Sequence, residues 1–511
     1  MVNTIVFENE ITLWWDIEEY PNAEKYQFSL DGKYHGETQK THYTFFGLQE
    51  ERAYRVRVEI YDGLGNKQTE EWQIQTQKKK NRLDVTKAPY NAVGDGKTLN
   101  TAALQKAFDD CTANDFVYIP KGKFMTGALN MHGENELYLE QGAILQGTAN
   151  PDDYLPKIKS RFEGTEGKCY RSLINIGELD YTAGYTTRNV FIRGKGVIFG
   201  GGEPLARAII DAEKLRLAEY LANNQDYVKT CESADTIPGR ARGRLINISN
   251  CENVTISGLT LGYGASWNVH FVYSKNVVTH DCQILSDNWE SADGVWKMEE
   301  VHNGDGWDPD SSEDCVIFNT VFNTRDDAIA IKSGKNPEGN LINRPTKNIC
   351  IFDCSSQLRG IAIGSELSGG ISDIKIWDCD FFNGKTGFNI KTTRKRGGYV
   401  KNVTTKRCAF ASVWITSEYN CNDDGDGNSN LTVVEDISFE DVKIKGTYPY
   451  LDKREQFFYT LYLSGFDGEE YHFKNLRFKN LQVYARDDGN MQCLKIKNVK
   501  NLTLENVNYF E

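Results

Sequence analysis

The 511-residue chain contains no run of 18 or more apolar residues, so no segment is expected to cross a membrane as a helix. The first four residues, Met1 to Thr4, show neither the basic stretch nor the apolar core of a secretory signal. We therefore expect a cytoplasmic protein without a membrane partner, or a secreted protein from which the signal has been removed.

Positive charge is also in short supply, with 59 Lys and Arg against 72 Asp and Glu, for a net charge of −13. A field of that sign disfavours nucleic acid as a partner, because phosphate binding needs a basic face. Twelve cysteines in 511 residues are too few for a disulfide scaffold. No CxxC pair with a matching second pair occurs, so we expect no metal site of the zinc type.

Residues 1–80 alternate apolar and polar side chains in short stretches such as 11–15, 26–30 and 54–60. Such stretches, separated by Asp-Gly turns, predict a small antiparallel β-sandwich. The pattern Leu48-x5-Tyr54-x-Val56-x-Val58 resembles a signature of fibronectin type III domains, in which the tyrosine hydroxyl ties a corner back to the backbone. The charged segment 78–82 ends this module.

From residue 84 onward a short unit recurs: a polar turn ending in Asn or Asp, followed by a brief apolar strand. The Asn or Asp of successive units falls at Asn189, Asn253, Asn276, Asp314, Asn348, Asp373, Asn402, Asp436, Asn475 and Asn501. Most units lie roughly 23 to 39 residues apart, a spacing typical of a solenoid. The sequence therefore predicts an all-β chain, with a right-handed parallel β-helix over 84–511 behind a small N-terminal β-sandwich over 1–80.

Four cysteines occupy the same place in four of these units, namely Cys282, Cys354, Cys379 and Cys408. Equal register puts them in one column of the coil, where a free cysteine packs as a small hydrophobe. We expect a core ladder rather than a metal or redox site.

Two segments rich in aspartate carry the strongest chemical signal, Asn303–Asp310 and Thr324–Ser333. They lie about one coil apart, so their carboxylates should share one face on adjacent rungs. Crowded carboxylates repel one another, and at least one should have a pKa high enough to hold its proton near neutral pH. Glycoside hydrolysis needs that combination of a protonated acid and an ionised base.

Two other interpretations compete. Asp305 and Asp308 could be ordinary turn residues, and clustered carboxylates could also bind calcium. An adjacent acidic pair, Asp326-Asp327, opens the apolar strand 328–331, where it is costly unless it has a chemical role. Chemistry is therefore favoured.

The chain resembles glycoside hydrolase family 28, the polygalacturonase family, whose β-helix carries the signatures N-x-D, D-D, G-H-G and R-x-K. The resemblance covers roughly 84–511 and includes cap-like and first-coil segments at 94–105, 117–122 and 139–143. Residues 364–370 (Gly-Ser-Glu-Leu-Ser-Gly-Gly) match best with bacterial exo-acting members, some of which carry a fibronectin-like module.

By that resemblance Asp326 would be the general acid, while Asp305 and Asp327 would position and activate water. The family inverts the anomeric carbon and needs no metal or organic cofactor. Substrate-binding positions would come from the same coils and comprise Asn303, Asp308, Arg325, Lys332, Arg359, Glu366, Asn389 and Lys391.

Two departures from the family pattern stand out. The G-H-G position falls in 357–360 and has no histidine, with Arg359 in its place. The R-x-K position is Asn389-Ile390-Lys391, so the lysine remains and the arginine is gone. That basic pair is thought to hold a galacturonate carboxylate, so its partial loss suggests a different sugar in that subsite.

The sequence therefore predicts an inverting, exo-acting hydrolase of an α-linked galacturonate-containing, pectic oligosaccharide. A rhamnogalacturonan-type hydrolase, a β-helix polysaccharide lyase and a catalytically silent glycan-binding β-helix remain alternatives. The oligomeric state does not follow from the sequence.

Three further segments carry expectations of their own. The insertion with Trp289, Trp296 and Met298 either walls a subsite or packs against a neighbouring loop. Residues 204–228 have helical spacing and predict an excursion over one face of the β-helix. The acidic stretch 422–427 is expected to be a solvated loop rather than a calcium site.

Overall fold

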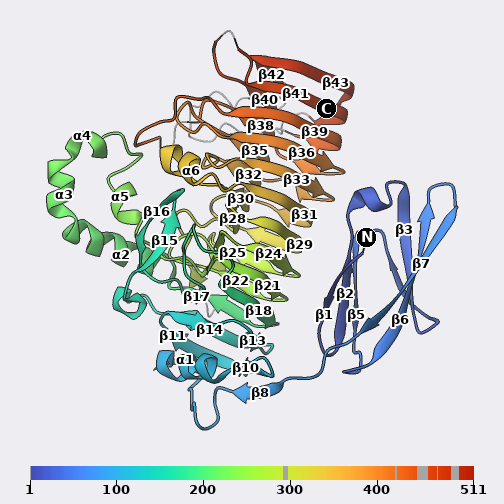
Figure 1. The fold of residues 1–511 in the computed structure, drawn as a ribbon, viewed down its shortest axis with the longest axis vertical. Helices are drawn as coiled ribbons and strands as arrows, with labels where there is room; N and C mark the ends of the chain where they lie inside the picture. Colours follow the sequence, from blue (N-terminus) through green and yellow to red (C-terminus); the bar gives the residue numbers. More distant parts are fainter. Residues whose placement is uncertain are drawn as a thin grey trace. The chain divides into compact units, whose positions relative to one another are not determined.

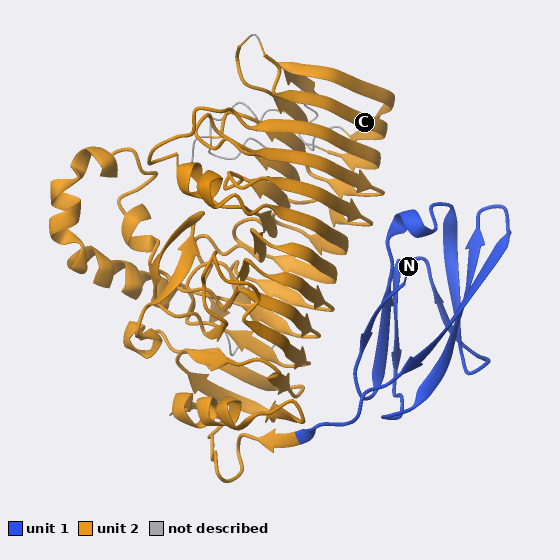
Figure 2. Ribbon diagram, viewed as in Figure 1, with its two compact units in different colours: residues 1–81 blue, residues 82–511 orange. Residues whose placement is uncertain are grey.

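The computed structural model describes residues 2–291, 297–419, 423–445, 459–468, 470–484 and 494–510. The chain divides into two compact units, residues 1–81 and residues 82–511 (Figure 2). No helix in the described ranges is long and apolar enough to cross a membrane.

The N-terminal unit contains two antiparallel sheets. One has β1 (Asn3–Val6), β2 (Glu10–Trp14) and β5 (His42–Phe46), and the other has β4 (Lys33–Thr38), β3 (Ala23–Leu30), β6 (Ala53–Asp62) and β7 (Lys67–Gln75), with η1 (Ile17–Glu19) between β2 and β3. Alternate residues of β6 are buried, as the sequence pattern requires. The Tyr54 hydroxyl accepts a hydrogen bond from the backbone N–H of Gln49 at 2.7 Å, which is the corner contact that the tyrosine pattern implied. Membership of the fibronectin type III family stays a prediction.

The second unit is a parallel β-helix, and this confirms the predicted fold class (Figure 1). One wall is an 11-stranded sheet of β12 (Leu129–Met131), β17 (Ile174–Ile176), β20 (Ile246–Ser249), β23 (Val269–Val272), β28 (Trp307–Asp310), β30 (Ile329–Ile331), β32 (Ile361–Gly364), β35 (Phe388–Lys391), β38 (Val413–Thr416), β40 (Leu461–Ser464) and β42 (Leu494–Lys497). Each strand pairs in parallel with the strand of the next coil.

The remaining walls form one continuous 21-stranded sheet. Its strands are β10 (Asp115–Ile119), β11 (Gly122–Thr126), β13 (Glu136–Leu139), β14 (Ala143–Gly147), β18 (Thr187–Gly194), β19 (Val197–Phe199), β21 (Cys251–Ser257), β22 (Thr260–Gly262), β24 (Lys275–His280), β25 (Gln283–Leu285), β29 (Glu313–Asn323), β31 (Thr346–Ser356), β33 (Ile371–Trp377), β34 (Asp380–Phe381), β36 (Tyr399–Lys406), β37 (Ala409–Phe410), β39 (Val433–Ile444), β41 (Phe473–Tyr484), β43 (Val499–Phe510), β8 (Asn81–Asp84) and β9 (Asp95–Leu99). Apolar side chains from both sheets fill one core that runs the length of the coils.

The repeated Asn or Asp has a structural reason. Asn253 and Asn276 have φ values of 60° and 52°, and Asp314 and Asn348 have 56° and 55°. Asn and Asp tolerate this left-handed conformation better than other residues with a Cβ atom. Their side chains also form a ladder, because Asn276 Nδ2 donates to Asn253 Oδ1 at 2.8 Å and Asn348 Nδ2 donates to Asp314 Oδ1 at 2.6 Å. The sequence repeat therefore marks the point where each coil turns into the longer sheet.

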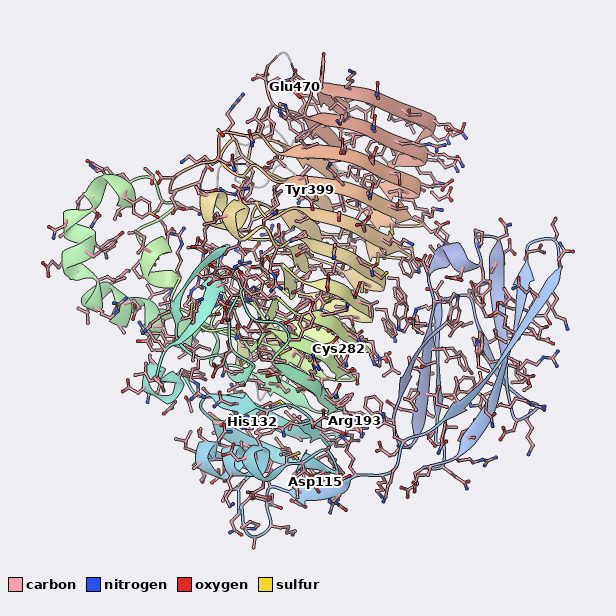
Figure 3. All side chains as sticks on the ribbon, viewed as in Figure 1. Asp115, His132, Arg193, Cys282, Tyr399 and Glu470 are labelled. Atoms are coloured by element: carbon pink, nitrogen blue, oxygen red, sulfur yellow. The ribbon has the colours of Figure 1, made fainter. Side chains whose placement is uncertain are left out.

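The four cysteines that share a register are free and buried in the core, where burial raises the pKa of Cys282 to about 12 (Figure 3, Cys282 labelled). Thr320 pairs with Cys354 and interrupts the column between Cys282 and Cys354. The predicted packing role of these thiols is confirmed.

Several helices and hairpins decorate the coils. They are α1 (Thr101–Asp110), η2 (Pro151–Tyr154), the hairpin β15 (Ile158–Phe162) with β16 (Thr165–Cys169), α2 (Gly202–Arg216), α3 (Ala218–Asn223), α4 (Gln225–Val228), α5 (Thr236–Gly239), the hairpin β26 (Trp289–Glu290) with β27 (Lys297–Met298), and α6 (Asn336–Ile342). Helices α2 to α5 project together from the coils (Figure 1), which confirms the helical excursion predicted over 204–228.

The aromatic insertion that contains Trp289 and Met298 packs against the coils. Trp289 lies edge-on to Phe199 with ring centroids 5.7 Å apart, and both Trp289 and Met298 pack against a small buried cluster. Of the two alternatives for this segment, packing is therefore correct for Trp289. Trp296 lies outside the described residues.

Candidate active site

Four consecutive strands of the 11-stranded sheet, β28, β30, β32 and β35, build the floor of the site. Their registers align Trp307 with Ile329, Ile361 and Phe388, all of which point into the apolar core. Because side chains alternate along a strand, the next residue of each strand faces outward. These outward residues are Asp308, Ala330, Ala362 and Asn389. Two alanines therefore leave room between an acid and an amide.

The aspartates that precede these strands lie on adjacent rungs, as their spacing predicted. Asp305 comes just before β28, and the pair Asp326-Asp327 comes just before β30. The backbone N–H of Gly306 donates to the carbonyl of Asp327 at 3.0 Å, which joins the two turns directly.

Two lysines, the buried Lys332 and the half-buried Lys391, hold this group of carboxylates together. Lys391 Nζ donates to Asp327 Oδ2 at 2.6 Å, and Lys332 Nζ donates to Asp305 Oδ2 at 3.3 Å. Lys332 Nζ also lies 3.9 Å from Glu366 Oε2. Five residues predicted separately from the sequence thus meet in one cluster.

Several oxygen atoms of the site are buried without a hydrogen-bond partner among the described residues. They are Oδ1 of Asp305, both carboxylate oxygens of Asp308, and Oδ1 of Asn389. Leaving a buried polar group unsatisfied costs about 1–3 kcal/mol, so such groups are rare unless something else satisfies them. Acceptors of this kind suit the hydroxyl groups of a sugar.

Protonation is divided unevenly among the carboxyls. Burial raises the pKa of Asp305 to about 8, with the charges of Asp326 and Asp327 acting in the same direction. Burial and the charge of Asp305 also raise the pKa of Asp308 well above its usual range. The predicted rise of at least one carboxyl pKa is therefore confirmed, and it falls on Asp305 and Asp308.

Asp326 behaves differently. Burial alone would raise its pKa, but the positive charges of Arg359 and Lys391 outweigh burial and lower it. These charges favour the ionised form of Asp326. Its role as general acid stays a prediction, and it requires that a substrate change this balance.

Arg359 stands in the position where the family motif has histidine. Its Nε donates to the carbonyl of Arg325 at 3.1 Å, and no carboxylate of a described residue lies within ion-pairing distance of it. A guanidinium with this freedom can bind an incoming carboxylate in a bidentate manner.

Two predicted substrate-binding residues lie outside the carboxylate cluster and already have partners. Arg325 Nε pairs with Glu300 Oε2 at 2.9 Å. Asn303 Oδ1 accepts a hydrogen bond from Arg242 Nη2 at 2.8 Å.

Several groups that support the site were missed by the sequence analysis. Arg161, which comes from the β15–β16 hairpin, pairs with Asp310 at 2.8 Å, and both side chains are fully buried. Burial lowers the pKa of His270 to about 4, so this neighbour of Asp310 is neutral. The cluster Arg240-x-Arg242-x-Arg244 just before β20 was a signal in an acidic chain, whereas Arg161 offered none.

Trp267 supports Lys332 from another side. Lys332 Nζ lies 4.6 Å from the centroid of the Trp267 ring, and Phe162 of the hairpin stacks on that ring with centroids 4.8 Å apart. The hairpin therefore fixes the lysine that faces Asp305.

The expectation of a solvated acidic loop over 422–427 is wrong for Asp424, although Gly425, Asp426 and Gly427 are exposed as expected. Asp424 is 2% exposed, and it accepts two hydrogen bonds from Arg240 at 2.8 and 3.0 Å and one from Lys335 at 2.8 Å. Tyr227 donates to the same carboxylate at 2.6 Å. Partners from distant segments bury this charge, and we refer to these four residues as the Asp424 cluster. Asn422 lies outside the described residues.

Among the described residues no group of three or more His, Cys, Asp or Glu side chains is arranged to hold a metal ion. The carboxylates of the site are instead interleaved with lysine and arginine, an arrangement that suits acid–base chemistry.

The family model of glycosyl hydrolases family 28 matches residues 117–480. A probable polygalacturonase from Vitis vinifera is 28% identical over 371 residues, covering 69% of this chain and 67% of the relative. An exo-poly-alpha-D-galacturonosidase from Dickeya chrysanthemi is 26% identical over 449 residues, covering 82% of this chain and 70% of the relative. A family 28 exopolygalacturonase from Yersinia enterocolitica shares the fold, with a TM-score of 0.79 at 21% identity over 98% of both chains.

The matched segment spans well over half of the chain and includes every aspartate of the site. It also contains both departures from the motif, Arg359 and Asn389. The chain therefore belongs to glycosyl hydrolases family 28 and is a glycoside hydrolase.

Proposed function

We propose that the protein is an inverting, exo-acting hydrolase that releases galacturonate from α-linked pectic oligosaccharides without a metal or cofactor. The observation that carries the proposal is the cluster of Asp305, Asp326 and Asp327 with its interleaved cations, one of which, Arg359, has no carboxylate partner among the described residues. Relatives named as exo-acting galacturonosidases support the substrate class.

In this proposal Asp326 donates a proton to the glycosidic oxygen as the bond to the anomeric carbon breaks. A water molecule adds to that carbon from the opposite face and gives its proton to Asp305 or Asp327. One water is consumed per bond, and one carboxyl is protonated before and after the reaction.

Substrate binding can supply the proton arrangement that the proposed mechanism needs. A uronate carboxylate paired with Arg359 would cancel one of the two charges that keep Asp326 ionised. Asp326 would then compete with Asp305, whose raised pKa favours its protonated form, for the shared proton. Coupled carboxyls share protons in this way, so a small change in local charge relocates one.

Inserted segments beside the site support exo action. Glu163, in the turn of the β15–β16 hairpin, pairs with Arg240 at 2.8 Å, and Arg240 belongs to the Asp424 cluster. The carbonyl of Gly164 in the same turn accepts a hydrogen bond from the backbone N–H of Lys335 at 3.0 Å. These bonds link the hairpin, the helical excursion and two loops of the coils into one wall beside Glu366.

Product analysis with end-labelled galacturonate oligomers, with and without EDTA, tests the proposal. We expect one small saturated product from the start of the reaction, at an unchanged rate in EDTA. Unsaturated products that absorb in the near ultraviolet would mean a lyase, and a ladder of intermediate lengths would mean endo action. Binding without turnover would identify a silent glycan-binding protein.

One observation favours a second candidate within the same class. The arginine of the R-x-K motif is replaced by Asn389, whose buried Oδ1 has no described partner. A hydrolase of rhamnogalacturonan type would place a neutral sugar there. Rhamnogalacturonan fragments therefore belong in the same panel of substrates.

A further inference from the structure

Two cavities of about 380 and 580 Å³ adjoin beside the catalytic turns, because Glu203, Arg207 and His302 line both. Helix α2 of the helical excursion (Figure 1) forms part of their wall. Their lining carries six carboxylates, and we call the combined space the acidic trough after these residues: Glu163, Glu203, Glu232, Asp235, Glu299 and Glu300.

The acidic trough is lined by close chain neighbours of the catalytic aspartates. Arg325, directly before Asp326, lines one cavity, and Asn303, two residues before Asp305, lines the other. His302 lines both cavities, and in its protonated form it would lower the pKa of Asp326. A general acid delivers its proton to the leaving-group oxygen, so the space beside Asp326 is where the leaving group must lie.

Charge decides what this space accepts. The three guanidinium groups of the lining are engaged, since Arg207 pairs with Glu203 at 2.6 Å and Arg325 pairs with Glu300 at 2.9 Å. The third, Arg242, donates to the backbone carbonyls of Ala265 and His302.

Two of the carboxylates, Glu232 and Glu299, are exposed and form no ion pair with any described residue. Glu163 and Asp235 also have cation partners, in Arg240 at 2.8 Å and Lys214 at 2.6 Å. Six acids therefore face five cations, and the net negative charge of the acidic trough rests on the two unpaired glutamates. No three of its side chains are arranged as a metal site in the described part of the chain. An anionic sugar would meet repulsion there, whereas carboxylate and amide oxygens accept hydrogen bonds from neutral sugar hydroxyls.

We propose that the acidic trough is the leaving-group subsite and that it takes an uncharged sugar rather than a second uronate. The inference rests on the proposed hydrolysis of galacturonosyl bonds and adds to it the chemistry of the group released. The protein would then cleave galacturonate from a neutral sugar in preference to cleaving polygalacturonate.

A matched pair of disaccharides provides the test: α-galacturonosyl-rhamnose and α-galacturonosyl-galacturonate. We expect kcat/KM to favour the neutral leaving group by on the order of 10-fold at low salt, with a smaller preference at high salt because screening weakens the repulsion. Equal values, or a preference for the uronate leaving group, would overturn the inference.

Charge reversal at the two unpaired glutamates of the acidic trough tests whether they cause the preference for a neutral leaving group. The double variant Glu232→Lys/Glu299→Lys should shift the preference by on the order of 10-fold toward the uronate leaving group. Glu219→Lys reverses an exposed charge of the same excursion outside the acidic trough and should leave the preference unchanged. An unaltered preference in the double variant, with both proteins folded by circular dichroism, contradicts the assignment.

The two proposals fail in distinguishable ways. Turnover of polygalacturonate without any preference between the disaccharides would reject the subsite and leave the proposed hydrolase intact. Cleavage of neither disaccharide nor any galacturonate oligomer would reject both. Calorimetric titration of Asp326→Asn with the two disaccharides measures the same preference without turnover, and tighter binding of the uronate pair would reject the subsite.

Discussion

Two groups of buried aspartates in this β-helix have opposite surroundings. In the Asp424 cluster the carboxylate accepts hydrogen bonds from Arg240, Lys335 and Tyr227, and the nearby cations lower its pKa despite burial. At the candidate active site, Asp308 has no described partner for either oxygen, and burial raises its pKa.

The difference shows how burial alone fails to identify function. A buried acid with every oxygen satisfied holds segments together, as Asp424 does between the excursion and two loops. A buried acid whose oxygens lack partners has a raised pKa and can form hydrogen bonds to a ligand. The contrast predicts that equivalent substitutions in the two groups have opposite consequences.

The largest expected effect is loss of activity at the unsatisfied group. Asp305→Asn should reduce kcat/KM on galacturonate oligomers by about 10³-fold, since acid–base groups contribute 10²–10⁴-fold. Its resistance to urea at pH 7 should be unchanged or raised, because Asp305 is a poorly compensated buried acid. A clear loss of stability would place Asp305 with the structural acids.

The converse substitution should affect stability. Asp424→Asn removes the charge that Arg240 and Lys335 share, and breaking such a buried pair costs about 3 kcal/mol of unfolding free energy. Asp226→Asn, at an exposed acid of the same excursion that pairs with Lys229, is the matched control and should change little. Equal urea midpoints for both variants would contradict the structural role of the cluster.

A smaller effect is expected at Arg359, the cation of the site without a carboxylate partner among the described residues. Arg359→Gln should lower kcat/KM on uronate substrates by on the order of 10- to 100-fold, because a hydrogen-bonded charge pair contributes about 1.5–3 kcal/mol. Arg188→Gln, an exposed arginine paired with Glu252 elsewhere on the coils, serves as control. A change in kcat alone, with substrate affinity intact, would argue against carboxylate binding by Arg359.

The smallest effect lies in the pH dependence of stability. The pKa of Asp305 is raised from an ordinary 3.8 to about 8 in the folded protein. Protonated Asp305 therefore contributes stability in full below about pH 3.8, and this contribution is lost as the pH rises toward 8. Asp305→Asn should therefore gain stability relative to the parent between pH 4 and pH 8.

Asp424 should show the opposite sign. The pKa of Asp424 is lowered in the folded protein, so its ionised carboxylate contributes stability at pH values above the ordinary pKa of an aspartate. That contribution disappears as the pH falls below about 4. The stability gap between the parent and Asp424→Asn should therefore narrow in acid. Urea midpoints across pH measure both slopes, and parallel slopes for the two variants would refute the contrast.

Much of the fold was predictable because its rules are local. Each coil has one position with a left-handed backbone conformation, as at Asn276 and Asn348, and Asn or Asp is favoured there. The repeat of the structure is therefore visible as a repeat of these residues in the sequence. Adjacent coils then place Asp305 beside Asp326-Asp327 by spacing alone.

The supporting contacts could not be predicted because they join distant segments. Arg161 reaches Asp310 across 149 residues, and Arg240 reaches Asp424 across 184. From sequence alone the acidic stretch around Asp424 looks solvated, since nothing local reveals its partners. The ionised state of Asp326 likewise depends on where Arg359 and Lys391 lie in space.

The anomeric configuration of the first product tests the central claim most directly. Proton NMR of fresh reactions on α-linked galacturonate oligomers should show the saturated β-anomer first in the parent protein, and almost no product from folded Asp326→Asn. An α-anomer formed first, an unsaturated product, or an undiminished rate in Asp326→Asn would contradict inverting hydrolysis by this aspartate cluster.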